Sequence, residues 1–156
     1  MGYFSLAPIA FEGVSQTTQT NSVELGTRVT VSGTFSGISD EYVYCLNNTG
    51  SSVTQGALMI QSGASLSRSS TAALDFPMVG VKNTAVSAGA YFWGLARGYM
   101  RVMSIAVTKG DLLTVGADGA VQTFTVATFS TGPLIGKVGD TATAATQPGC
   151  FLKLFG

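Results

Sequence analysis

The sequence predicts an all-β fold: a small β-barrel or sandwich, built as one body or as two related lobes, with an extended N-terminal arm. Three observations lead to this prediction. No window keeps apolar residues at the i, i+3, i+4 and i+7 spacing of an amphipathic helix. Short β-branched and aromatic runs instead alternate with clusters of Gly, Ser, Asn and Asp, as strands alternate with turns. Part of this pattern also repeats along the chain.

Ten segments have the composition of strands and are bounded by turn-forming residues. In chain order they are Val23–Val31, Glu41–Leu46, Ala57–Gln61, Phe76–Val81, Ala90–Ala96, Tyr99–Ser104, Asp111–Val115, Val121–Ala127, Leu134–Val138 and Gly149–Leu154. Asp118-Gly119 favours the positive φ of a tight hairpin, and Asn47-Asn48-Thr49-Gly50 is a similar turn. Arg97-Gly98 separates two apolar runs, which predicts a further hairpin. Many short strands with frequent turns are typical of sandwiches and barrels.

Residues 1–22 differ from the rest of the chain. They begin with large apolar side chains, become rich in Ser, Thr and Gln, and show no alternation. An extended arm that becomes ordered only against a neighbouring molecule has this composition. A first strand followed by a loose linker is the alternative. In the arm interpretation the apolar side chains are candidates for binding a partner: Tyr3, Phe4, Leu6, Ile9 and Phe11.

Residues 23–156 form the predicted β domain, and three pairs of similar segments occur in it in the same order. The pairs are 53–59 with 107–113, 77–82 with 133–138, and 88–92 with 148–152. The first pair shares a V-T-x-G turn, and the second shares a proline, two apolar residues and a glycine. We therefore expect two pseudo-repeats, about 41–98 and 99–156, with glycines that fix the turns. Chance similarity among β-rich segments is the alternative.

The shortage of charge is the unusual property of the composition. Only 10% of the residues are Asp, Glu, Lys or Arg, against about 25% in an average soluble protein. We expect other protein to cover much of the surface, although a Thr-rich monomer would have a similar composition. Eight basic and eight acidic residues cancel, and no basic run is present, so nucleic acid is not an expected partner. No apolar stretch of membrane-spanning length and no signal peptide is seen, which predicts a cytoplasmically made protein without a membrane partner.

Nothing in the sequence predicts catalysis. The chain has no histidine, which removes the commonest general base and the histidine-containing metal sites. No nucleotide-binding or nucleophile motif is present, and we expect neither a cofactor nor a metal ion. A pair of carboxylates that converge in space, as in a glycosidase, is the remaining enzymatic alternative. Cys45 and Cys150 lie in apolar strand candidates and are expected to be free thiols in the core.

Three further side chains have two readings. Trp93 suits a sugar-binding platform or a protein hot spot if exposed, but a single Trp in a strand more commonly belongs to the core. Arg97 and Arg101 flank the predicted hairpin. They are candidate partner-binding residues, with solvation of a sheet edge as the alternative.

Several segments resemble a family of small structural proteins of tailed phages, usually encoded beside the major capsid gene. The opening of these proteins is similar to Glu24-Leu25-Gly26-Thr27-Arg28-Val29 followed by Glu41-Tyr42-Val43-Tyr44. Their central stretch resembles Val79-Gly80-Val81 followed by Ala88-Gly89-Ala90-Tyr91-Phe92-Trp93-Gly94. One of their turns is similar to Val107-Thr108-Lys109-Gly110-Asp111-Leu112-Leu113 through Asp118-Gly119. The doublet Phe92-Trp93 departs from the family's usual glycine before tryptophan.

The resemblance covers most of residues 24–154 and implies a capsid decoration, or head cement, protein. Such a protein is a β-barrel or sandwich that commonly forms a homotrimer. It would bind the major capsid protein on the outer capsid surface of the virion, over the junctions between subunits. Another virion component is the alternative function: a fibre, a tail component or a glycan-binding spike module. Residues 1–22 lie outside the resemblance, so their expected role rests on composition alone.

Overall fold

The computed structural model describes residues 17–18, 23–33, 38–62, 65–68, 78–104, 106–125, 134–139 and 147–154. This part of the chain is all-β, as the sequence predicts, and contains no α-helix. No helix in it is long and apolar enough to cross a membrane. The strands are β1 (Thr17–Thr18), β2 (Arg28–Ser32), β3 (Ser39–Asn47), β4 (Leu58–Ser62), β5 (Ser65–Arg68), β6 (Met78–Gly80), β7 (Tyr91–Arg101), β8 (Leu112–Val115), β9 (Val121–Thr123), β10 (Gly136–Val138) and β11 (Gly149–Lys153); one 3-10 turn, η1, spans Ala117–Gly119.

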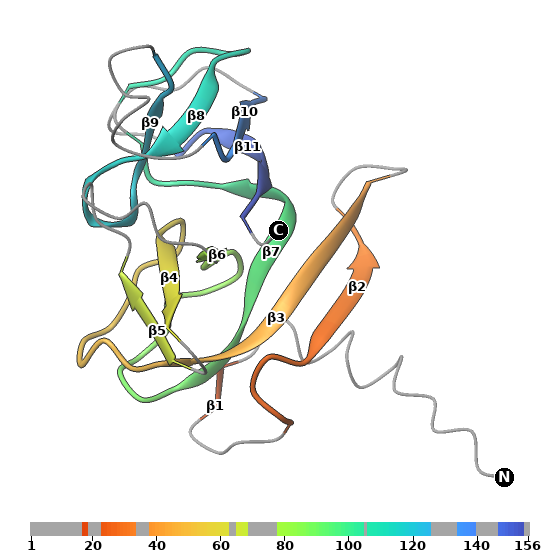
Figure 1. Ribbon diagram of the computed structural model, residues 1–156, viewed down its shortest axis with the longest axis vertical. Coiled ribbons are helices and arrows are strands. Elements are labelled where there is room, and N and C mark those ends of the chain that lie inside the picture. Colours follow the sequence, from red (N-terminus) through yellow and green to blue (C-terminus); the bar gives the residue numbers. More distant parts are fainter. Residues whose placement is uncertain are drawn as a thin grey trace, which may run out of the picture.

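The strands join into one sheet that is antiparallel except between β3 and β5. Its order is β2-β3-β5-β4-β6-β7-β11-β10-β8-β9, with β1 paired to β7 beside this path. The path is open, because β2 and β9 end it, so the sheet as a whole does not close into a barrel. Within it β3 also pairs with β7, so five strands (β3, β5, β4, β6 and β7) pair in a ring. Figure 1 shows β8–β11 gathered at one end of the molecule and β2 at one side.

The long strands β3 and β7 lie at the centre and are buried on both faces. Along β3, Tyr42 and Tyr44 belong to one core cluster, and Val43 and Cys45, which point to the opposite face, belong to another. Burial on two faces explains why residues 42–46 of β3 and 91–96 of β7 form almost continuous apolar runs rather than alternating ones. Trp93 is in the first cluster, 9% exposed, with its ring centroid 5.0 Å from that of Tyr44. Its core reading is therefore confirmed.

Four turns of one kind precede β2, β4, β7 and β8. In each, a glycine has φ between 72° and 92°: Gly26, Gly56, Gly89 and Gly110. The glycine N–H donates to a carbonyl on a neighbouring segment, and the N–H of that same residue donates back to the carbonyl after the glycine. Two residues thus oppose one, which is the G1 form of β-bulge, and it needs a residue that accepts positive φ.

The predicted Asp-Gly hairpin is confirmed between β8 and β9. Asp118 has φ 52° and Gly119 has φ 79°. Gly116 and Ala120 close the turn, because the Gly116 N–H donates to the Ala120 carbonyl over 2.8 Å. Asp tolerates the left-handed region better than most residues with a side chain, which explains this pair.

The predicted hairpin at Arg97-Gly98 is wrong. The two apolar runs on either side form the single strand β7, and the irregularity is a bulge where Glu41 pairs with Arg97 but Tyr42 pairs with Leu95. Gly98 has φ 134°, and a Cβ on it would overlap the Asp40 carboxylate. The glycine is therefore required by a close approach of two strands, and not by a chain reversal.

The first pair of repeated segments has equal local structure. Gly56 N–H donates to Val81 O over 2.8 Å, and Gly110 N–H donates to Val138 O over 3.0 Å. Each turn leads into a strand that pairs antiparallel with a short strand, β4 with β6 and β8 with β10. The third pair of segments differs, because Gly89 lies in a turn whereas Gly149 lies in β11. The division into two halves remains a prediction.

Little of the predicted arm falls within the described residues. Thr17 and Thr18 form β1, which pairs with Phe92 and Tyr91 at the start of β7. These two residues are part of the sheet, and the extended arm remains a prediction. Residues 1–16 and 19–22 lie outside the described residues.

Candidate interaction surface

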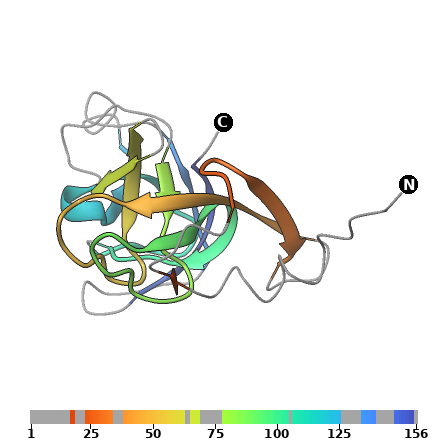
Figure 2. The ribbon, with the colours of Figure 1, turned by 90° about the horizontal axis from the view of Figure 1, so that it is seen from below.

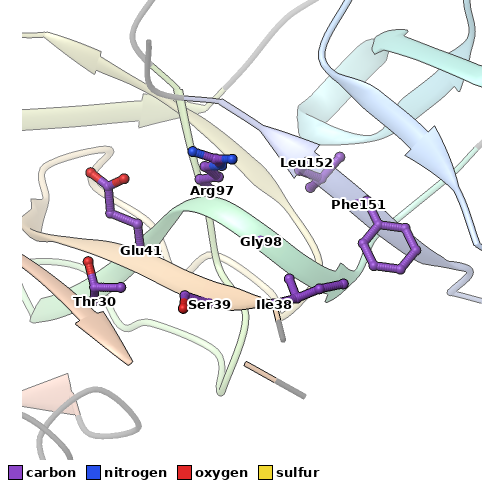
Figure 3. A pocket seen from close by; sticks show the side chains of 8 residues that line it. All are labelled: Thr30, Ile38, Ser39, Glu41, Arg97, Gly98, Phe151 and Leu152. Atoms are coloured by element: carbon purple, nitrogen blue, oxygen red, sulfur yellow. The ribbon is translucent and has the colours of Figure 1, made fainter. Parts of the chain in front are cut away.

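Two adjoining grooves lie over β7, β11 and the strands next to them. The first, of about 560 Å³, is lined by residues of β2, β3, β7 and β11 and by Ile38, just before β3. The second, of about 440 Å³, is lined by residues of β7, β8, β10 and β11 and by Leu134 and Ile135. They share Arg97, Phe151 and Leu152, so they form one continuous surface, which we call the β7–β11 surface. Figure 3 shows the first groove, with Gly98 between the side chains of Ile38, Arg97 and Phe151.

The exposed large apolar side chains of the described residues all line this surface. Ile38 is 37% exposed, Leu112 46%, Leu134 52% and Phe151 37%. We call these four residues the apolar rim. Single exposed apolar residues scattered over a protein need no explanation, but their concentration around two grooves is typical of an interaction site.

Three cationic side chains lie on the same surface. Arg97 on β7 is directly opposite Lys153 on β11, and Phe151 is directly opposite Lys137 on β10. Residues directly opposite in antiparallel strands point to the same face of the sheet. Arg97, Lys137 and Lys153, which we call the cationic cluster, are all exposed. Within the described residues none of the three has an ion pair, and the nearby Glu41 pairs with Arg28 over 2.8 Å.

A buried ion pair supports the floor of the first groove. The Asp40 side chain, 3% exposed, pairs with Lys82 and accepts a hydrogen bond from the Tyr99 backbone N–H over 3.1 Å. The Lys82 ammonium also lies 5.9 Å from the centroid of the Tyr42 ring. This network joins β3 to β7 directly beneath Gly98, where the bulge occurs, so it holds the groove in a defined shape.

Of the candidate partner-binding residues predicted from the sequence, one lies on the β7–β11 surface and one does not. Arg97 lies at the junction of the two grooves. Arg101 is exposed but lines neither groove, and its guanidinium donates to the Gln147 carbonyl over 2.9 Å. The other five candidates lie outside the described residues: Tyr3, Phe4, Leu6, Ile9 and Phe11.

Sequence reasoning missed the apolar rim, although one member has a recognisable signal. In β11 the buried side chains are those of Cys150 and Leu152, and Phe151 shares the exposed phase of the alternation with Lys153. An aromatic residue on the polar side of an alternating strand is such a signal. Leu112 directly precedes three buried residues of β8, and no local pattern reveals that its own side chain is left uncovered.

Metal-binding and reactive side chains do not gather elsewhere in the described residues. They contain no group of three or more Cys, Asp or Glu residues that could hold a metal ion. Cys45 and Cys150 are buried and are not joined in a disulfide, as predicted. Burial raises the pKa of the Cys45 thiol to about 12, and burial together with the nearby Asp40 raises the pKa of the Tyr42 phenol. Both groups stay protonated at neutral pH and belong to the core.

No protein-family model and no curated protein matches the chain.

Proposed function

We propose that this chain is a virion structural protein that binds the outer surface of a capsid and cements neighbouring major capsid protein subunits. The observation that carries the proposal is the β7–β11 surface, on which the exposed large apolar side chains of the described residues gather. A surface of this kind on a chain with only 10% charged residues suits a protein that works in contact with other proteins.

The rigidity of the support also favours this role. The grooves lie on paired strands, and β7 contacts both β3 and β11, whose residues line them. A binding surface built on strands keeps its shape and loses little conformational entropy when a partner binds. Such a protein stabilises the assembled shell by mass action, because it binds the shell and not the free subunits. Many copies act together, so each contact need only be moderate in strength.

Co-sedimentation tests the proposal. The full chain, expected to be a homotrimer in solution, is mixed with expanded capsids or with unexpanded procapsids of the phage whose genome encodes it, each stripped of this protein. We expect saturable binding to expanded capsids and weaker binding to procapsids. Absence of binding to both particles would contradict the proposal. Binding to host glycans together with that absence would favour the spike-module alternative.

A further inference from the structure

We propose that the β7–β11 surface recognises an acidic and apolar segment of its protein partner. Carboxylates of this segment would contact the cationic cluster, and large apolar side chains beside them would cover the apolar rim. The identification of the partner as capsid protein rests on the proposed function, whereas the chemistry of the segment follows from the surface itself.

The cationic cluster provides the electrostatic argument. Arg97 and Lys153 are directly opposite on neighbouring strands, and like charges in that position repel each other. Lys137 extends the cluster onto β10, across from Phe151. Three of the eight basic residues thus lie together in a chain whose net charge is zero. A carboxylate placed between Arg97 and Lys153 would remove the repulsion and gain two charge-assisted contacts.

The apolar rim defines what surrounds the carboxylate. Leu112 and Phe151 both lie directly opposite Lys137, one on each side of it, so apolar and cationic side chains alternate across the sheet. The Phe151 ring packs beside that of Tyr99, which is directly opposite on β7, with the two ring centroids 5.2 Å apart. A partner that brought only charge would leave these side chains uncovered, and one that was only apolar would desolvate three unpaired cations.

The same two properties argue against other occupants. Nucleic acid gains affinity from many phosphate contacts, commonly six to ten, and gains nothing from covering Leu112 or Leu134. A second copy that presented this same face would bring its cationic cluster against an identical one. An acidic, apolar segment of a different protein fits both the charge and the apolar rim.

Substitutions in the cationic cluster test the proposal with stripped, expanded capsids as the probe. We expect Lys153→Glu to lower the affinity of the chain for capsids by about tenfold or more, and Arg97→Glu to do the same. Lys109→Glu is the matched control, because it makes the same charge change at an exposed turn residue that lines neither groove. We expect the control and the charge-preserving Lys153→Arg to bind as the unsubstituted chain does. Leu134→Ser should also weaken binding by about tenfold, because it removes a half-exposed apolar side chain that would otherwise be buried against the partner.

The outcomes separate this proposal from the proposed function. If the unsubstituted chain binds capsids and Lys153→Glu binds equally well, the present proposal fails and the proposed function stands. If the unsubstituted chain does not bind capsids, both fail. A change in the mass of the free oligomer on Lys153→Glu, measured by sedimentation velocity, would assign the surface to a second copy and overturn the proposal. Binding of a 30-bp duplex DNA that Lys153→Glu abolishes would overturn it as well. Thermal unfolding of each variant excludes loss of fold as the cause.

Discussion

At the scale of single residues, the buried pair of Asp40 and Lys82 has the largest structural consequence. Asp40 on β3 pairs with Lys82, after β6, and accepts a hydrogen bond from the Tyr99 N–H on β7, close to where the strand register shifts. Its carboxylate also occupies the space that a side chain at position 98 would need. A buried pair does not contribute much net stability by itself, but removal of one partner leaves an unpaired buried charge. The pair therefore specifies the bulge and, through it, the floor of the first groove.

We expect Asp40→Asn to lower the free energy of unfolding by about 3–5 kcal/mol, because the Lys82 ammonium loses its counter-charge in a mostly buried position. Urea denaturation measures this change. The double variant Asp40→Asn with Lys82→Met should regain a large part of the loss, since it removes both charges. A single variant within about 1 kcal/mol of the unsubstituted chain would show that the pair does not hold the strands together.

Alkaline pH provides a second test at this scale. The pKa of the Cys45 thiol is raised from 9.0 to about 12, so between these values the unfolded chain loses a proton that the folded chain keeps. The contribution of the protonated Cys45 thiol to the free energy of unfolding is therefore fully present below pH 9. It is lost as the pH rises towards 12, by about 1.4 kcal/mol per pH unit. The raised pKa of Tyr42 acts in the same direction at higher pH. We expect urea unfolding at pH 8, 9.5 and 10.5 to show this fall. Cys45→Ala should reduce its slope, and an unchanged slope would contradict the assignment.

At the scale of elements, glycines set where the strands begin and where β7 bends. The four G1 bulges need positive φ but leave open space at several positions, whereas Gly98 is also enclosed by Asp40. Substituting these glycines therefore has two different costs. At a bulge glycine with open space around it the cost is backbone strain alone, whereas at Gly98 a steric overlap with the buried Asp40 side chain is added.

We expect Gly98→Ala to destabilise the fold by about 3 kcal/mol or more, because strain at φ 134° adds to the overlap with Asp40. Gly50→Ala is the matched control. Its φ is 77°, but a Cβ there has no neighbouring atom within 4 Å, so we expect a cost of about 1–2 kcal/mol. Equal losses in the two variants, measured by urea denaturation, would mean that the contact between β7 and Asp40 is not tight.

Some strands could be predicted from the sequence and others could not. The ten predicted strands overlap nine observed ones, two of them on β7, because β-branched and aromatic runs between turn formers are local signals. The run of β7 was divided wrongly at Arg97-Gly98, since a glycine in a bulge has the same local signature as a glycine in a turn. β5 was not predicted: Ser65-Leu66-Ser67-Arg68 contains a single large apolar residue, and its pairings with β3 and β4 are decided by tertiary structure. The β7–β11 surface was predicted only through Arg97, because its other residues come together through non-local pairing.

At the scale of the whole molecule, the topology separates a buried centre from an exposed binding surface. β3 and β7 are covered on both faces over most of their length. Beyond β7 the sheet continues with β11, β10 and β8, in that order. Seen from below in Figure 2, the ring strands and the β8–β11 end form one body from which β2 projects at the side. This arrangement exposes both the apolar rim and the cationic cluster of the β7–β11 surface, which we propose meets the capsid.

Cryo-electron microscopy of phage particles made by the genome that encodes this chain tests the proposed function most directly. The proposal predicts copies of the β fold on the outer capsid surface, at junctions between major capsid protein subunits, with the β7–β11 surface against the shell. Particles that lack this density, or that carry the protein only in a tail or fibre, would contradict it.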